Sequence, residues 1–183
     1  HLSLIENYKC DVSSGPFYDK AENIPEIYSP TISNQFCSGN SVVKKSVFKK
    51  VGLFDELFNQ MRGGDGEFGA RCVMNNLYII NNPKAYCIDL KAVYGGFRDF
   101  GIWDAMRSAN LLSPIPSPSI LYYFRKYWGS KLTILSMLQR IPFSLNHYKL
   151  KRSKYNKIIS LLIFITTIPL VLFRFTLSWN KAT

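Results

Sequence analysis

Charge divides this chain into two parts that face different folding constraints. All 12 acidic residues lie at or before Asp104, where 11 Lys and Arg nearly balance them, whereas residues 105–183 include 12 Lys and Arg and no acid. The second part also contains residues 158–173, a run of sixteen residues without a charge. A basic, acid-free segment of this kind indicates either an arm that binds nucleic acid or a segment that faces a membrane.

The apolar run favours the membrane. It would extend as far as Trp179 if the side chain of Arg174 reaches back to the interface. Five Lys and Arg in residues 147–157 would stay on the cytosolic side, because cytosolic loops of membrane proteins are enriched in positive charge. We therefore expect a transmembrane or membrane-embedded helix at residues 157–179. The alternative is a buried core helix, since uncharged runs shorter than about 18 residues are ambiguous.

A cluster of prolines precedes this tail. Residues 111–118 contain three prolines within five positions, which disfavours a helix and predicts a linker. Residues 119–156 combine aromatic, leucine and basic side chains without an acid, a composition typical of an amphipathic helix in the plane of a membrane. The aromatic residues occur with Leu and Ile rather than on a polar sheet face, which argues against nucleic acid as a partner.

The first part shows short helical and extended patterns. Ser41 or Ser46 is a candidate N-cap for the first helix, Gly52 is a candidate stop, and Asn75 and Asn76 tolerate the left-handed geometry that would end the second helix. Together, the apolar spacing and the turn residues predict a short helix that begins after Ser41 or Ser46 and ends before Gly52, a second helix at 65–75, and strands at 77–80 and 85–88. These elements indicate an α/β fold.

Asp65 opens the second predicted helix, directly after the pair Gly63 and Gly64. A carboxylate at that place is most often a helix cap, because the unpaired N–H groups and the helix dipole favour negative charge. Glu67 and Arg71 are four residues apart on the same helix and can form an ion pair. Position alone therefore assigns Asp65 a structural role.

The order of the motifs suggests more. A G-N pair at Gly39 and Asn40 is followed by a basic and apolar helix, then V-G-x-F-D-E-x-F, then G-G-D-x-E-x-x-x-R, and finally a strand ending near N-P-x-A. This combination, over residues 8–107, resembles the acceptor-side half of family 2 glycosyltransferases with the GT-A fold. The resemblance implies a partial, Rossmann-like GT-A domain at residues 1–110 that lacks its N-terminal nucleotide-binding half, followed by the helical membrane-associated tail.

The resemblance also implies roles for single residues. Asp65 matches the general base of the family, which would take the proton of an acceptor hydroxyl as its oxygen attacks the anomeric carbon of a nucleotide-sugar, with inversion. An intrahelical pair that holds Asp65 in place is the alternative for Glu67 and Arg71. Arginine suits a phosphate and tryptophan a sugar face, although Arg98 can also be a solvated loop charge. The implied substrate-binding residues are Gly39, Asn40, Gly64, Glu67, Arg71, Arg98 and Trp103.

The sequence departs from the family in its metal site. A divalent metal, Mg or Mn, would neutralise the leaving nucleotide diphosphate, but the D-x-D ligands are absent from this chain. Asp89 stands near where many members carry a histidine that approaches the metal, and a carboxylate there would add negative charge next to phosphates. Gly64 stands at the position before the base, where many members of the family carry a glutamate. We therefore expect a C-terminal fragment that is inactive alone.

The resemblance implies an inverting glycosyltransferase that moves a single sugar, since the Q-x-x-R-W element of processive synthases is absent. Its partners would be a nucleotide-sugar donor, a lipid-linked or surface-glycan acceptor and the membrane. Its place would be the cell inner membrane, with the catalytic part on the cytosolic side. The alternative is a non-catalytic, membrane-bound interaction module that keeps the fold. The four cysteines show no C-x-x-C spacing and fit a reducing cytosol rather than a zinc site.

Overall fold

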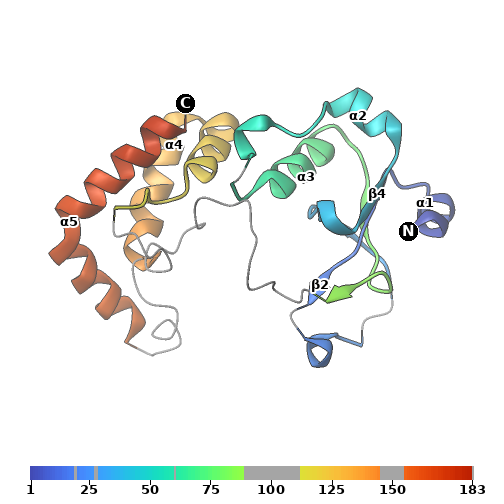
Figure 1. The fold of residues 1–183 in the computed structure, drawn as a ribbon, viewed down its shortest axis with the longest axis horizontal. Coiled ribbons are helices and arrows are strands. Elements are labelled where there is room, and N and C mark those ends of the chain that lie inside the picture. The colour runs from blue at the N-terminus through green and yellow to red at the C-terminus, as the bar shows by residue number, and fades with distance from the viewer. Residues whose placement is uncertain (19, 27–28, 60, 89–111, 145–154, 183) are drawn as a thin grey trace. The chain divides into compact units, whose positions relative to one another are not determined.

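The computed structural model describes residues 1–18, 20–26, 29–59, 61–88, 112–144 and 155–182. The chain forms two compact units (Figure 1). Unit 1 comprises His1–Glu56 and Gly64–Gly96, and unit 2 comprises Leu57–Gly63 and Phe97–Thr183. The division is not a simple cut along the chain, because a short segment before the glycine pair belongs to the second unit.

Unit 1 is a mixed α/β unit. Its helices and strands are α1 (Leu2–Tyr8), β1 (Val12–Ser14), β2 (Phe17–Tyr18), β3 (Thr31–Ser33), β4 (Ser41–Val43), α2 (Lys45–Val51), α3 (Gly64–Met74), β5 (Ile79–Asn81) and β6 (Cys87–Ile88). Short 3-10 turns lie at η1 (Ala21–Asn23), η2 (Ser38–Asn40) and η3 (Glu56–Phe58), the last of which runs into unit 2.

The main sheet has the strand order β3-β5-β1-β4. β1 and β5 are parallel, whereas β4 and β3 run antiparallel to their neighbours; in register, Ser13 lies opposite Ile80 on one side and Val42 on the other. β2 and β6 form a separate parallel pair. Among the described residues, β3 and β4 are therefore the edge strands of the sheet.

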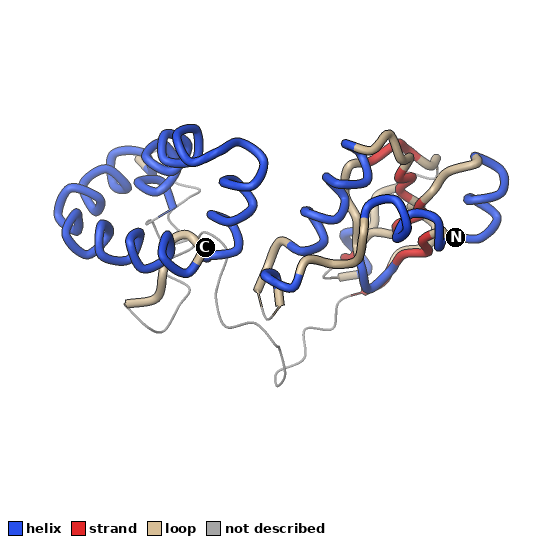
Figure 2. Tube along the Cα trace, turned by 90° about the horizontal axis from the view of Figure 1, so that it is seen from above, coloured by secondary structure: helices blue, strands red, loops and turns tan. Residues whose placement is uncertain are grey.

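Helices cover both faces of this sheet, on opposite sides of the strands in Figure 2. Successive side chains of a strand point to opposite faces, so Ile79 and Ile80 serve different cores. Ile79 packs in the core of α2 and α3, with Val12, Phe36, Val47, Phe68 and Cys72. Ile80 packs under α1, with Leu4, Ile5 and Cys10.

The local predictions for unit 1 are partly confirmed. Gly52 ends α2 with a φ of 82°, and α3 ends at Met74 before Asn76, whose φ is 56°. Neither Ser41 nor Ser46 is the N-cap, because residues 41–43 pair with β1 as strand β4 and α2 begins at Lys45, with Lys44 in the N-cap position. Tertiary pairing overrides local helical spacing there. The predicted strands at 77–80 and 85–88 are shifted or shortened to β5 and β6.

Unit 2 is built from two long helices, α4 (Pro118–Ser144) and α5 (Asn156–Lys181). α4 is interrupted at Gly129, whose φ of 74° and ψ of 167° are not helical, so it consists of two shorter helices. The two helices and the segment before α4 share one core. Its buried residues are Ile115, Leu121, Phe124, Met137, Ile141, Val171 and Ala182.

The proline-rich segment does not behave as the predicted linker. Ile115 and Ser117 each have only 1% of their surface exposed, and the N–H of Ile115 donates to the carbonyl of Arg174 in α5. Proline disfavours a helix here, so the segment packs against α5 as a non-helical stretch that bends at residues 115–116. The second unit also includes residues 57–63, because Phe58 packs on Tyr122 with ring centroids 5.6 Å apart.

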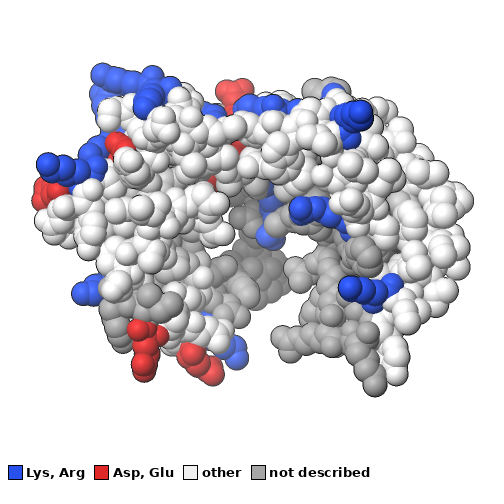
Figure 3. Space-filling model, turned by 180° about the vertical axis from the view of Figure 1, so that it is seen from behind, with Lys and Arg blue, Asp and Glu red and all other residues white. Residues whose placement is uncertain are grey.

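α5 is long and apolar enough to cross a membrane. Its candidate span covers 25 residues, Lys157–Lys181, and only 17% of its most apolar window is buried in the protein, unlike the core helix of a soluble domain. Where Figure 3 draws described residues of unit 2, their visible surface is white apart from isolated Lys and Arg side chains. α5 continues past Trp179 to Lys181, but Arg174 does not reach back to an interface. It is buried, and its Nε donates to the carbonyl of Ser113.

Candidate active site

Asp65 lies in the first turn of α3 and is exposed. Gly63, with a φ of 103°, turns the chain immediately before this helix, a conformation that glycine adopts without steric cost. The Oδ2 atom of Asp65 accepts a hydrogen bond from the backbone N–H of Ser38 at 3.3 Å. This hydrogen bond connects Asp65 to a residue 27 positions earlier in the chain. It links the G-D-x-E helix to the G-N turn.

The G-N turn is η2, which connects three parts of unit 1. The amide Nδ2 of Asn40 donates to the carbonyl of Ala85 at 2.6 Å, and its Oδ1 lies 3.2 Å from Nε2 of His1. The carbonyl of Asn40 accepts the N–H of Gly15 at 2.8 Å. Gly39 lies against Phe17, because a Cβ atom at this position would be 3.3 Å from the ring. Asn40 therefore connects η2 to α1, to the loop after β5 and to the loop after β1.

These groups gather at the carboxyl ends of the parallel strands β1 and β5. The hydroxyl of Ser14, the last residue of β1, accepts the N–H of Cys37, and the carbonyl of Ser14 accepts the N–H of Asn82, which follows β5. Open α/β sheets bind ligands in the crevice outside the carboxyl ends of their strands. Asp65 bonds to the residue that follows Cys37, so it stands beside this edge.

Glu67 and Arg71 lie behind the site rather than in it. The side chain of Glu67 is 1% exposed, and its Oε2 accepts a hydrogen bond from Nε of Arg71 at 2.9 Å. Nη1 of Arg71 continues to the carbonyl of Val51 at the end of α2, and the guanidinium stacks over Phe68 at 5.3 Å. The pair joins α3 to α2, as its alternative interpretation proposes. The buried Glu67 thus helps to hold α3, and with it Asp65, against α2.

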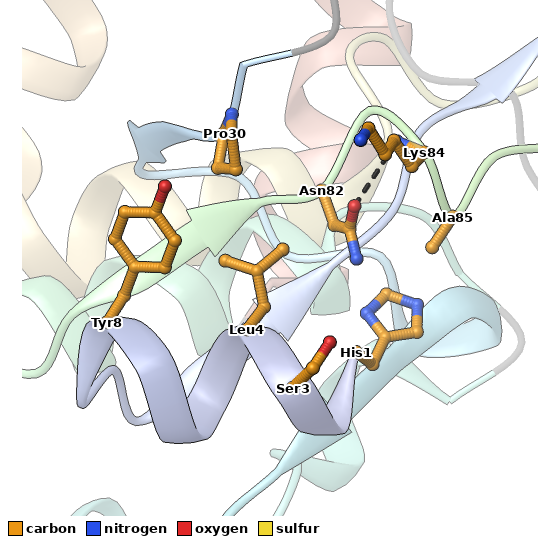
Figure 4. Close-up of a pocket in the computed structure, with 8 residues that line it drawn as sticks. All are labelled: His1, Ser3, Leu4, Tyr8, Pro30, Asn82, Lys84 and Ala85. Atoms are coloured by element: carbon orange, nitrogen blue, oxygen red, sulfur yellow. Dashed lines mark hydrogen bonds between the residues drawn. The ribbon is translucent and has the colours of Figure 1, made fainter.

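A pocket of about 430 Å³ opens near the same strand ends (Figure 4). α1 contributes one wall, and the loop after β5 contributes the opposite wall, where the Oδ1 of Asn82 accepts the N–H of Lys84 at 3.2 Å. The His1 ring links the pocket to Ser13, with Nδ1 2.8 Å from its hydroxyl. The lining residues are His1, Ser3, Leu4, Tyr8, Pro30, Asn82, Lys84 and Ala85.

No pattern in the sequence predicts this pocket. N-P-x-A indicates only the end of a strand, and nothing in the sequence of residues 2–8 shows which of them face the loop after β5. Asp65 does not line the pocket. His1 and Ala85 do line it, and Asn40 is hydrogen-bonded to both of them. The pocket and the carboxylate are thus two parts of one strand edge, joined through η2.

Of the remaining expected site residues, one lies beside Asp65. Gly64 is the first residue of α3, next to Asp65. Asp89, Arg98 and Trp103 lie outside the described residues. In the part of the chain that the structure describes, no three His, Cys, Asp or Glu side chains form a group that could hold a metal ion.

Comparisons of the chain with protein-family models, with curated proteins and with solved structures found no match. A function for this chain must therefore be argued from the chemistry of its site, because a mixed α/β arrangement serves many unrelated activities.

Proposed function

We propose that this chain forms the acceptor side of an inverting glycosyltransferase of the GT-A type, with Asp65 as its general base. One observation carries the proposal: the Asp65 carboxylate is exposed and is held by the Ser38 N–H beside the carboxyl ends of β1 and β5. The G-N turn and the G-D-x-E helix, two of the motifs whose order resembles that of family 2 glycosyltransferases, are adjacent there. A carboxylate in such a position is accessible to a hydroxyl group and has a fixed orientation.

The reaction needs one base on this side. The Ser38 N–H occupies Oδ2, which leaves Oδ1 to accept the proton of the acceptor hydroxyl. As this proton moves to Asp65, the hydroxyl oxygen forms a bond to the anomeric carbon of the donor sugar. The bond from that carbon to the nucleotide diphosphate breaks on the opposite face, and its electron pair leaves with the phosphate oxygen. The product has the inverted configuration.

The other described residues support this geometry without touching the reacting atoms. Asn40 fixes η2, which carries the N–H that orients Asp65. The Glu67–Arg71 pair fixes α3 against α2. Gly39 and Asn40 lie where an acceptor would approach, and Arg98 and Trp103 remain proposed contacts of the donor phosphate and a sugar ring.

We place the nucleotide and its Mg or Mn ion on residues outside this sequence. The free side of β4 supports this placement, because an edge strand presents N–H and C=O groups that another strand can pair with, and no strand of the described residues pairs there. The apolar helix α5 favours work at a membrane, on a lipid-linked or surface-glycan acceptor. We assign the site to the cytosolic face of the cell inner membrane, where nucleotide-sugars are available.

The test uses the complete product of the reading frame that contains this sequence, in membranes of the expressing cell. Membranes are incubated with radiolabelled UDP-glucose, UDP-galactose, UDP-N-acetylglucosamine and GDP-mannose in turn, and label in lipid and glycan fractions is measured. We expect one donor to label a fraction with the wild-type protein and not with Asp65→Asn. If no donor gives label above the background of cells without the protein, the non-catalytic module is the better interpretation.

A further inference from the structure

Unit 2 has an apolar core, and it also buries several polar side chains while exposing many large apolar ones. Six polar side chains are at most 3% exposed, namely Ser117, Ser119, Thr133, Ser160, Arg174 and Ser178. The outside carries large apolar side chains instead, from α4 (Trp128, Leu132, Leu135, Leu138) and from α5 (Leu161, Leu162, Ile165, Leu172, Phe173). Soluble monomers rarely expose a contiguous apolar surface of this kind while burying serine and arginine.

Hydrogen bonds within the unit satisfy its buried polar groups. The hydroxyl of Ser178 donates to the carbonyl of Pro116, and that of Thr133 donates to the carbonyl of Gly129 at 2.7 Å. Nε of Arg174 donates to the carbonyl of Ser113. Among the described residues, the one buried side-chain N or O atom without a partner is Nη2 of Arg71, which belongs to unit 1. A lipid environment requires that buried polar groups form hydrogen bonds within the protein, because acyl chains offer no hydrogen-bonding groups.

The two sides of α5 are clearly different. Ser160, Val171, Arg174, Ser178 and Ala182 are buried and recur at helical spacing, so one side of the helix packs within the unit. Small residues at such an interface let helices approach closely, as in membrane helix pairs. The exposed positions are mostly leucine, isoleucine and phenylalanine, with Thr166, Pro169 and Thr176 among them. Water is a poor solvent for this exposed side, and hydrocarbon is a good one.

α4 shares this outward apolar side. Its second helix, after Gly129, exposes Leu132, Ile134, Leu135 and Leu138, all between 42% and 61%. Fifteen helical residues span about 22 Å, which is shorter than the hydrocarbon core of about 30 Å, so this helix can enter one leaflet without crossing it. Lys131 and Arg140 have stems long enough to place their charges at the headgroups.

The charge pattern selects the partner. Residues 105–183 contain 12 Lys and Arg and no acid. A second copy of unit 2 would bring like charges together, whereas a bilayer offers acyl chains for the leucines and anionic headgroups for the basic side chains. We infer that α4 and α5 enter an anionic lipid bilayer together as one helical hairpin, with the second helix of α4 in contact with acyl chains beside α5. This inference goes beyond a single anchoring helix and does not depend on sugar transfer.

Photocrosslinking from single positions tests the hairpin in the full chain, in vesicles of phosphatidylcholine and phosphatidylglycerol that contain a tritiated phospholipid. The photoreactive residue p-benzoylphenylalanine replaces Leu135 in α4, Ile165 in α5 or, as a control, Leu53 in unit 1. All three side chains are more than half exposed, so the replacements do not disturb a core. We expect tritiated adducts from positions 135 and 165 and none from position 53.

Adducts from position 165 without adducts from 135 would overturn the hairpin and leave α5 as the single inserted helix. Absence of adducts from both positions would overturn membrane insertion altogether. Equal adducts from all three positions would also overturn it, because lipid contact would then be unspecific. Thermal unfolding of each variant, followed by circular dichroism, shows that the chain has kept its fold. None of these outcomes bears on whether Asp65 is a base.

Discussion

Asp65 and Glu67 are two residues apart on α3 but lie in opposite environments. Asp65 is exposed and meets a backbone N–H of η2, whereas the side chain of Glu67 is 1% exposed and is paired with Arg71 at 2.9 Å. The proposal thus gives Asp65 a chemical role, whereas packing gives Glu67 a structural one. Substitution of each should affect a different measurement.

Asp65→Asn should lower sugar transfer by roughly two to four orders of magnitude with little change in stability, because asparagine keeps the size of the side chain and its acceptor oxygen but removes the base. Initial rates with the complete protein and thermal unfolding by circular dichroism measure the two effects. Glu22→Gln, at an exposed carboxylate of η1, is the matched control and should transfer at the normal rate. Near-normal transfer by Asp65→Asn would return Asp65 to a structural role.

Glu67→Ala should lower the free energy of unfolding by about 3–5 kcal/mol, because it leaves the partly buried Arg71 cation without its partner. Urea unfolding followed by circular dichroism measures this change. Glu56→Ala, at an exposed carboxylate in η3, should change the same quantity by less than about 0.5 kcal/mol. The double variant Glu67→Ala with Arg71→Leu should recover part of the loss. A single Glu67→Ala variant as stable as the control would show that the pair contributes nothing.

The sequence predicts the elements whose signals are local. Glycine at 52 and asparagine at 76 adopt positive φ angles, and α3 begins within a residue of its predicted start. Residues 41–43 form a strand only because β1 lies beside them, and no local pattern contains that information. The burial of residues 115–118 likewise depends on α5, which lies far along the chain. Motif order identified Asp65, but the hydrogen bond to Ser38 and the pocket near α1 required the fold.

Gly15 occupies a place where any side chain collides with the backbone. A Cβ atom there would lie 1.9 Å from the carbonyl oxygen of Ala85 and 2.3 Å from Nδ2 of Asn40. Gly15→Ala should therefore lower the free energy of unfolding by at least the roughly 1–3 kcal/mol typical of overpacking. It should also weaken transfer, because Asn40 must move and η2 with it.

Gly66→Ala is the matched control for that substitution. Gly66 lies inside α3 with no atom within 4 Å of a Cβ at its position, so alanine should stabilise the helix by up to about 1 kcal/mol. Urea unfolding measures the free energy of unfolding of both variants. It distinguishes a steric collision at Gly15 from an effect that any glycine-to-alanine substitution would have. Equal stability of Gly15→Ala and the wild type would contradict the close approach of Ala85.

The cysteines should react in two classes. Burial is the main cause that raises the pKa of the Cys10 and Cys72 thiols above their ordinary value of 9.0, whereas Cys37 and Cys87 are half-buried. Reaction requires the thiolate and access to it. Two thiols per chain should therefore react rapidly with Ellman's reagent at neutral pH, and two should react only after unfolding in urea. Four equally fast thiols would contradict the packing of both cores.

The same pKa shifts determine how stability depends on pH. A thiol whose pKa is raised by folding keeps its proton when the unfolded chain has lost it, so its contribution is complete below the unfolded pKa and is lost as pH rises through the folded pKa. The urea midpoint should therefore begin to fall as pH rises past about 9, the ordinary value of these groups. Cys72→Ala should reduce the size of that fall. An unchanged pH dependence in this variant would assign the fall to other groups.

The last prediction concerns how unit 2 holds the membrane. Attraction between basic side chains and anionic headgroups is screened by salt, whereas inserted apolar area is not. Membranes that carry the protein should therefore retain it through washes with high salt and with alkaline carbonate. Leu161 and Ile165 lie on the exposed side of α5, so Leu161→Asp with Ile165→Asp leaves the core of the unit intact.

Each of these aspartates costs up to about 2.5–3.5 kcal/mol near the centre of a bilayer, so the double variant should appear in the soluble fraction or bind only at low salt. Leu53→Asp places the same charge on an exposed leucine of unit 1 and should remain with the membranes. If the wild-type protein itself washes off in high salt, the apolar side of α5 is not inserted, and headgroup attraction alone accounts for binding. If the double variant resists carbonate like the wild type, residues 161 and 165 do not face the acyl chains.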